Sequence, residues 1–367
     1  MTKLLDRGFD VNHRGRTGCT SLFHAALHGQ TDVVKWLIRR GASSDFRDRF
    51  AQTPLHYAAE CDNGSCLAPF LSSGLKVDAV NDDGDQPIHI AAAAGRLEPL
   101  AFLLDNGANI DAKGFNGYTP LLYAITKGQH NIVSFLMSKG ATLKVKSEGD
   151  YGANALEYAA QFGCPSIVRL LINRAPSYCA YWIEKHGDHF SPVHLACSKG
   201  NEEILKLLLD SAPASWRIDS ATIKSHSRTP LHEAVKSSSV ECIDMLLRNG
   251  ASAIARDASG DTPLHYAASG GCTAGLGRLI DSLPRSCVET YVNFQSGAGR
   301  TPLMEAIIGG YERSVELLLR EGASVTVKDR NGWSVMDLAR KSGRPSILKA
   351  LMDHSASIGD IHRSLSA

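Results

Sequence analysis

One seven-residue string, Thr53-Pro-Leu-His-Tyr-Ala-Ala59, occurs again without change as Thr262-Pro-Leu-His-Tyr-Ala-Ala268. With its first residue as an anchor, weaker copies follow along the chain at spacings of 33, 33, 33, 35, 37, 38, 33, 39 and 33 residues. A fixed period of this length is typical of stacked supersecondary units, not of separate globular domains. The ten anchors are Thr20, Thr53, Gln86, Thr119, Asn154, Ser191, Thr229, Thr262, Thr301 and Ser334.

Glycines recur at three positions of the period, as Gly84, Gly95 and Gly107 do around the anchor Gln86. Because glycine readily adopts the left-handed conformation of turns and helix ends, these positions mark the boundaries of helices. The anchor is suited to cap a first helix, and proline commonly follows it at the first helical position. A second helix is expected between the last two glycines of each period.

The second helices carry paired apolar residues, such as Ile132 and Val133 followed by Leu136. This spacing gives a wide apolar stripe that a single helical hairpin cannot bury. A segment rich in Asp, Asn and Gly then leads to the next anchor, with the chemistry of a β-turn. A unit of two helices and a turn buries its apolar faces only by stacking on its neighbours.

In these residues the chain resembles the ankyrin-repeat family, with ten motifs in phase over about residues 13–352. The resemblance implies an all-α solenoid whose repeats each comprise helix, turn, helix and a projecting β-hairpin finger. It also implies a curved, elongated stack that binds macromolecules through its concave face, formed by the fingers and the first helices. Catalysis is not an activity of that family.

Composition excludes several other classes. The chain has 367 residues, 39 Lys and Arg against 38 Asp and Glu, and a formal charge of +1, so no nucleic-acid or membrane partner is expected. Nine cysteines without a CxxC pair favour an intracellular, reducing setting, in cytoplasm or nucleus. The start of the chain is not a secretory signal. We expect a monomer that binds a protein partner.

The two ends depart from the repeat. Residues 1–12 resemble the end of a preceding repeat whose first helix is missing, which indicates a fragment, a misassigned start or an end covered by something else. Residues 13–352 are expected to form the solenoid of ten repeats. Residues 353–367 are expected to form a short, frayed polar tail.

The second repeat also departs from the pattern, because Pro69 falls inside its expected second helix. Proline within a helix costs about 3 kcal/mol, so a distorted or shortened helix is predicted there. Cys61 and Cys66 flank the unusual turn that precedes it, and either is a candidate for exposure.

Three long periods carry four to six extra residues each, in the segments 175–183, 212–218 and 283–294. Insertions in solenoids map to loops, often on the binding face, and Trp and Tyr are favoured interface residues. We therefore expect the partner surface at repeats 4 to 7. Its candidate residues are Phe115, Asn116, Tyr118, Lys127, Asp150, Tyr151, Phe162, Tyr181, Trp182, His186, His189, Phe190, Trp216 and Arg217.

Other interpretations remain open. The long fingers at 175–190, 212–228 and 283–300 either bind a partner or pack onto their own repeats. The leading function is a stand-alone scaffold or adaptor. The alternatives are a recognition module of a larger signalling or effector protein and, third, an enzyme or an enzyme accessory protein with a ligand site.

No catalytic, metal or cofactor residues are assigned. Five histidines share one position of the repeat, for which the resemblance implies a structural hydrogen-bonding role; they are His56, His89, His194, His232 and His265. The series His186, His189, His194, Cys197 has a superficial zinc-like spacing, but the last two belong to a helix and the first two to a finger. The glycine-rich run 270–277 has no lysine where a phosphate-binding loop needs one.

Overall fold

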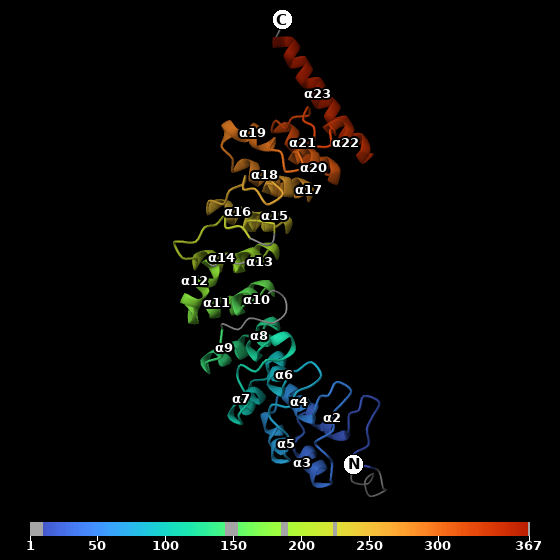
Figure 1. Cartoon of the computed structure of the whole chain (residues 1–367), viewed down its shortest axis with the longest axis vertical. Coiled ribbons are helices and arrows are strands. Elements are labelled where there is room, and N and C mark those ends of the chain that lie inside the picture. The colour runs from blue at the N-terminus through green and yellow to red at the C-terminus, as the bar shows by residue number, and fades with distance from the viewer. Residues whose placement is uncertain (1–9, 144–152, 185–189, 223–225, 366–367) are drawn as a thin grey trace. The chain divides into compact units, whose positions relative to one another are not determined.

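A computed structural model describes residues 10–143, 153–184, 190–222 and 226–365, with only the backbone given for 357–365. Helices account for all the regular elements of these residues. The chain divides into two compact units, Met1–Leu171 and Ile172–Ala367. Each unit is a series of helical hairpins (Figure 1).

All ten predicted anchors are N-cap residues of a first helix. Seven of these helices have proline in the first turn, where its missing N–H costs no hydrogen bond. The first helices are α2 (Ser21–Leu27), α4 (Pro54–Glu60), α6 (Pro87–Ala94), α8 (Pro120–Thr126), α10 (Ala155–Gln161), α13 (Pro192–Ser198), α15 (Pro230–Lys236), α17 (Pro263–Ser269), α20 (Pro302–Gly309) and α22 (Val335–Ser342).

A second helix follows each of these, after a turn that usually contains a glycine in the left-handed conformation. Its apolar stripe is buried, as the spacing predicts; Ile132, Val133 and Leu136 are examples. The second helices are α3 (Thr31–Arg39), α5 (Ala68–Ser72), α7 (Leu97–Asp105), α9 (His130–Ser138), α11 (Pro165–Arg174), α14 (Glu202–Asp210), α16 (Val240–Arg248), α18 (Thr273–Asp281), α21 (Glu312–Arg320) and α23 (Pro345–Leu365).

Within each unit the first helices pack in chain order. In the first unit α2 contacts α4, α4 contacts α6, α6 contacts α8, and α8 contacts α10; in the second, the series is α13, α15, α17, α20, α22 (Figure 1). Small residues at the contacts, such as the fully buried Ala58, Ala59, Ala91 and Ala92, let the helix axes approach closely. The core of each unit is therefore a row of such contacts.

The five histidines that share the fourth position of the Thr-Pro-Leu-His string have the structural role that the resemblance implies. In His56, Nδ1 accepts the backbone N–H of Thr53 (3.1 Å), so the ring proton lies on Nε2, which donates to the carbonyl oxygen of Asp85 in the next repeat (3.1 Å). Nε2 of the other four rings bonds in the same way to the carbonyl oxygens of Ala112, Arg228, Asp261 and Arg300. Burial lowers the pKa of His56, His232 and His265 to about 4.

The fingers are tight turns, with no β-ladder in the part of the chain that the structure describes. One isolated antiparallel bridge joins Lys328 and Ser334. Most of the described turns are closed by a backbone bond over four residues, as from Asp48 N–H to Gln52 O (3.0 Å), whereas the bond from Thr222 N–H to Arg228 O spans six. Successive fingers are joined by a further backbone bond, such as Arg49 N–H to Thr17 O (3.1 Å). The expected hairpins are thus reduced to linked turns.

The irregular periods account for the remaining elements. Repeat 2 has the shortened helix predicted from Pro69: a single 3-10 turn, η1 (Gly64–Cys66), precedes the five-residue α5. Two of the insertions form extra helices that the period does not predict. These are α12 (Pro176–Glu184) and α19 (Val288–Val292), the latter preceded by the 3-10 turn η4 (Arg285–Cys287).

The last helix is longer than the sequence predicts. Residues 353–365, expected as a frayed tail, continue α23 as a helix to Leu365. No proline or glycine pair interrupts this stretch, so nothing in the local sequence stops the helix.

Candidate protein-interaction surface

The finger before α8 presents three of the predicted site residues in the first unit. The 3-10 turn η2 (Phe115–Gly117) forms its tip, where Asn116 adopts a left-handed φ of 53°, a conformation that asparagine tolerates better than most residues. Phe115 is 48% exposed. Tyr118, which follows the turn, is half-buried.

A carboxylate from the preceding repeat holds this finger in place. Asp85 Oδ1 accepts the backbone N–H of Phe115 (3.0 Å), and the hydroxyl of Tyr123 donates to both carboxylate oxygens (2.7 and 2.8 Å). A Cβ on Gly114 would overlap this carboxylate, which explains glycine at that position. Burial and the hydrogen bond to Asp85 raise the pKa of Tyr123.

An aromatic row then leads from the finger to the end of α10. The ring of Tyr118 meets those of Tyr123 and Tyr158 edge to face, at centroid distances of 5.7 and 5.3 Å. Tyr158 in turn stacks on Phe162 at 6.1 Å. Phe162 is 49% exposed and Lys127, which ends α8, is exposed as well. The structure thus joins Tyr118 and Phe162 through Tyr158, a residue that sequence reasoning did not select.

We call the set Phe115, Tyr118, Tyr123, Tyr158 and Phe162 the aromatic row. Its two ends are exposed and its middle is supported by packing and by Asp85. Such an arrangement offers a rigid apolar surface, the kind that provides interface hot spots. Sequence signals for Tyr123 and Tyr158 existed, since both occupy the fourth position after an anchor, as Tyr57 and Tyr266 do.

In the second unit, α12 presents two further predicted residues. Cys179 and Ile183 are buried, whereas Tyr181 is 52% exposed and Trp182 is half-buried. The rings of Tyr181 and Trp182 meet edge to face at 5.1 Å. The first insertion therefore packs through one side of a helix and keeps an aromatic ring at the surface.

The other predicted residues of the second unit are more engaged within the chain. Phe190 is half-buried, with its ring 5.9 Å from that of His194 and beneath the guanidinium of Arg228. Trp216 is half-buried, and its indole N–H is buried without an acceptor. Arg217 is exposed. Asp150, Tyr151, His186 and His189 lie outside the described residues.

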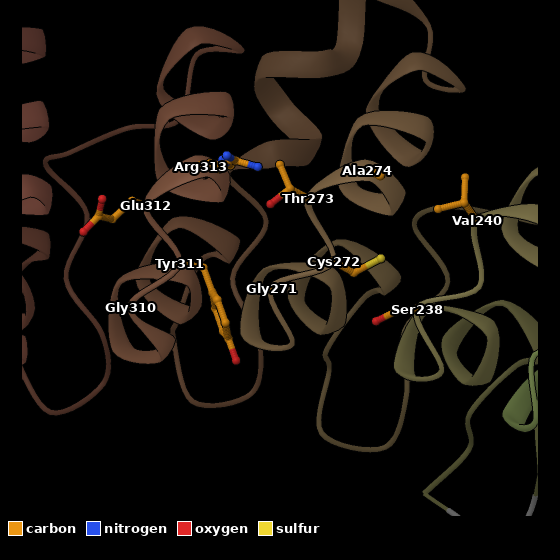
Figure 2. Close-up of a pocket in the computed structure, with 10 residues that line it drawn as sticks. All are labelled: Ser238, Val240, Gly271, Cys272, Thr273, Ala274, Gly310, Tyr311, Glu312 and Arg313. Carbon is orange, nitrogen blue, oxygen red and sulfur yellow. The ribbon is translucent and has the colours of Figure 1, made fainter.

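A hollow of about 810 Å³ lies at the turns of three successive repeats in the second unit, where sequence reasoning expected no site. Figure 2 shows Tyr311 projecting at the start of α21 beside the turn that holds Gly271. The ring is 37% exposed, and Cβ atoms on Gly271 or Gly309 would overlap it. The sequence signal for this hollow was Tyr311, which lies ten residues after its anchor. The same position in the other repeats is Gln, Asn, Cys, Ser or Arg.

The zinc-like series and the glycine-rich run 270–277 have structural surroundings where the structure describes them. Among the residues that the structure describes, no three His, Cys, Asp or Glu side chains gather as metal ligands. His194 is bonded at both ring nitrogens, and burial raises the pKa of Cys197 well above its ordinary value. The run 270–277 spans the turn between α17 and α18 and follows no strand. No helix of the described chain is both long and apolar enough to span a bilayer.

Comparison with known proteins decides the family. A family model for ankyrin repeats (3 copies) matches overlapping segments from 1–81 to 276–362. The chain is an ankyrin-repeat protein. Ankyrin repeats, and the relatives described next, fit a protein-interaction module.

Three relatives are of particular interest. The probable 26S proteasome regulatory subunit p28 of Saccharomyces cerevisiae is 35% identical over 151 residues, 41% of this chain and 63% of that protein. Inversin of Canis lupus familiaris is 29% identical over 176 residues, 48% of this chain and 16% of that protein. Human NF-kappa-B inhibitor alpha is 37% identical over 102 residues, 28% of this chain and 32% of that protein. The matches span less than two thirds of each relative.

Proposed function

We propose that this ankyrin-repeat protein is a non-enzymatic scaffold that binds a protein partner through its fingers and first helices. The observation that carries the proposal is the aromatic row of the first unit, with Phe115 and Phe162 exposed at its ends. Exposed rings on a braced surface lose little conformational entropy on binding, so their apolar area contributes efficiently to affinity.

The chemistry of this surface indicates the kind of partner. Of the predicted site residues that the structure describes in the first unit, Lys127 carries a charge. The others are aromatic or amide residues: Phe115, Asn116, Tyr118 and Phe162. Binding through such a surface depends on burial of apolar side chains more than on electrostatic attraction. The proposed partner therefore presents apolar side chains, and its binding is only weakly sensitive to salt.

The experiment compares captured proteins between variants. The immobilised chain is incubated with lysate beside the double variant Phe115→Ala, Phe162→Ala. Leu97→Ala serves as a matched control, because Leu97 is an exposed apolar residue at the start of α7. A partner of the aromatic row is recovered by the wild type and the control, and its purified form binds the double variant at least about tenfold more weakly. Equal affinity for the folded double variant would refute the proposed surface.

A second candidate is a recognition module within a larger protein. It is favoured by the match to a segment that makes up 16% of Inversin. An intracellular, reducing setting is proposed for either role, because nine dilute cysteines without a CxxC pair are unlike a secreted disulfide framework. Reading the coding sequence on both sides of this chain for in-frame repeats decides between the two candidates.

A further inference from the structure

The turn of repeat 2 differs from the turns of the other repeats. In repeat 1, three residues separate α2 from α3, whereas seven residues separate α4 from α5. Cys61 follows α4 directly as its C-cap residue, and Cys66 closes the 3-10 turn η1. The delayed helix start therefore places two cysteines at the ends of one short loop.

Neighbouring repeats hold this loop from both sides. The amide of Asn63 donates to the carbonyl oxygen of Gly29 and contacts the hydroxyl of Thr31, both at 3.2 Å. On the other side the backbone N–H of Gly64 donates to Glu98 Oε2 (3.4 Å). A Cβ on Gly64 would approach the backbone of Glu98 to 3.0 Å, so the chain passes close to repeat 3 there. These contacts restrict the loop and, with it, the two thiols.

The two thiols are enclosed and lie on either side of the Asn63 carbonyl group. Cys61 is 6% exposed and Cys66 is fully buried, contrary to the exposure considered from the sequence. The Cys61 sulfur lies 3.3 Å from the carbonyl oxygen of Asn63, which also accepts the backbone N–H of Cys66 (3.1 Å), and the Cys66 sulfur lies 3.9 Å from the carbonyl oxygen of Ala26. The Cys61 thiol lies 3.0 Å from the carbonyl oxygen of Ala58, its acceptor at the end of α4. The carbonyl of Asn63 therefore brings both cysteines together in the reduced protein.

Their acidities differ in a way that distinguishes this pair from the other cysteines. The neighbouring Cys66 thiol lowers the pKa of Cys61, against the opposing effect of burial. The neighbouring Cys61 and burial raise the pKa of Cys66. Burial also raises the pKa of Cys197 and Cys242, which are likewise buried. Cys61 thus has the greater thiolate character, and the thiolate is the nucleophile.

We infer that Cys61 and Cys66 form an oxidative modification site, which a hydroperoxide converts into an intramolecular disulfide. The Cys61 thiolate attacks the peroxide oxygen; the O–O bond breaks, and Cys61 becomes a sulfenic acid while hydroxide (from hydrogen peroxide) leaves. The Cys66 sulfur then attacks the Cys61 sulfur, the S–S bond forms, and water leaves with the thiol proton. The two thiols supply two electrons, and one peroxide is reduced to two waters.

Size and position favour this oxidant. Hydrogen peroxide is little larger than water, so a small local opening of the loop beside Cys61 admits it, whereas bulky disulfides are excluded. Transient disulfides of this kind occur in reducing compartments as redox-responsive features. The inference does not depend on which partner the aromatic row binds.

Mass spectrometry of the full-length chain tests the inference. The reduced protein is treated with hydrogen peroxide, quenched with N-ethylmaleimide and digested with trypsin. Both cysteines fall in one tryptic peptide, Phe50–Lys76. The expected product is a peptide that is lighter by two hydrogens and carries no N-ethylmaleimide. It is expected to form at least about tenfold faster than Cys197 or Cys242 is modified.

Variants and a denatured sample complete the test. In Cys66→Ser, Cys61 is expected to be trapped by dimedone as a sulfenic acid, and in Cys61→Ser the reactivity of Cys66 is expected to fall. In urea the preference over Cys197 and Cys242 is expected to disappear. Double alkylation of Phe50–Lys76 at peroxide levels that modify Cys197 or Cys242 would overturn the inference, as would an unchanged preference in urea.

Discussion

At the scale of single residues, the buried histidines show how one side chain joins two repeats. Nδ1 accepts a backbone N–H at the start of its own helix, and Nε2 donates to the next repeat. This arrangement needs the neutral ring, because a proton on Nδ1 would abolish the first bond. The repeat interfaces are therefore sensitive to acid.

His56 gives a pH prediction. Its pKa falls from 6.5 to about 4 on folding, so the unfolded chain binds the proton more readily and stability decreases as pH falls from 6.5 toward 4. His56→Ala is expected to be less stable than the wild type at pH 7.5. The difference between their free energies of unfolding is expected to narrow below pH 6.5, by up to about 1.4 kcal/mol per pH unit. Urea unfolding of both proteins between pH 7.5 and 4.5 measures this gap. A constant gap would contradict the neutral, buried state.

Tyr123 gives a second prediction at this scale. Tyr123→Phe removes the hydroxyl that donates to the Asp85 carboxylate and leaves this buried carboxylate with fewer donors. We expect a loss of about 1–3 kcal/mol in the free energy of unfolding. Tyr311→Phe is the matched control, because the Tyr311 ring is exposed and its change should stay within about 0.5 kcal/mol. Chemical denaturation measures both variants. Equal losses of stability would show that the Asp85 carboxylate does not depend on the Tyr123 hydroxyl.

At the scale of elements, helix starts were readable from the sequence and the elements outside the period were not. Every anchor became an N-cap because nine of the ten are Thr, Ser or Asn, which are favoured N-cap residues, and the tenth, Gln86, is followed by proline at the first helical position. The helix α12 was missed although it has its own signals: Pro176 in its first turn, and Cys179 and Ile183 one turn apart on the buried side. The repeat pattern led us to interpret these residues as a finger.

The candidate site was predictable only in part, for a physical reason. Phe115 and Phe162 stand out as aromatic residues in turns, so their exposure follows from position. Their connection through Tyr158, and the role of Asp85, depend on contacts between residues tens of positions apart. The proximity of Cys61 to Cys66 likewise depends on the loop contacts with Gly29 and Glu98.

The turn glycines give a prediction for this scale. Gly271 has a φ of +68°, and a Cβ there would overlap the Tyr311 ring, whereas Gly140 has a φ of +86° and open space around it. Gly140→Ala should cost about 1 kcal/mol for the left-handed backbone, and Gly271→Ala about 1–2 kcal/mol more for the clash. Thermal unfolding of both variants measures the difference. Adding Tyr311→Ala should restore Gly271→Ala to the level of Gly140→Ala; no restoration would exclude the ring as the cause.

At the scale of the whole molecule, repeats 4 to 7 remain the predicted partner surface. The insertions of the second unit can be tested separately from the aromatic row of the first. Trp182→Ala with Trp216→Ala removes two half-buried rings from the first two insertions. If the insertions bind, affinity for the partner falls by about tenfold or more, as titration calorimetry would measure. Trp333→Ala, an exposed ring on a finger of a later repeat, should leave affinity unchanged. A folded double variant with full affinity would assign the insertions to packing alone.

Successive fingers are linked by backbone bonds, from Arg49 to Thr17, from Asp82 to Phe50 and from Arg330 to Ala298. These links use the backbone alone, although some finger side chains bond across as well, as Arg47 does to the carbonyl oxygen of Val80. An exposed tip residue such as Phe50 is therefore free to change while the frame is kept. Phe115 is different, because its N–H is bound by the side chain of Asp85. New specificities can therefore evolve, or be grafted, one tip at a time, and a replacement of the Phe115 tip must also preserve its acidic neighbour.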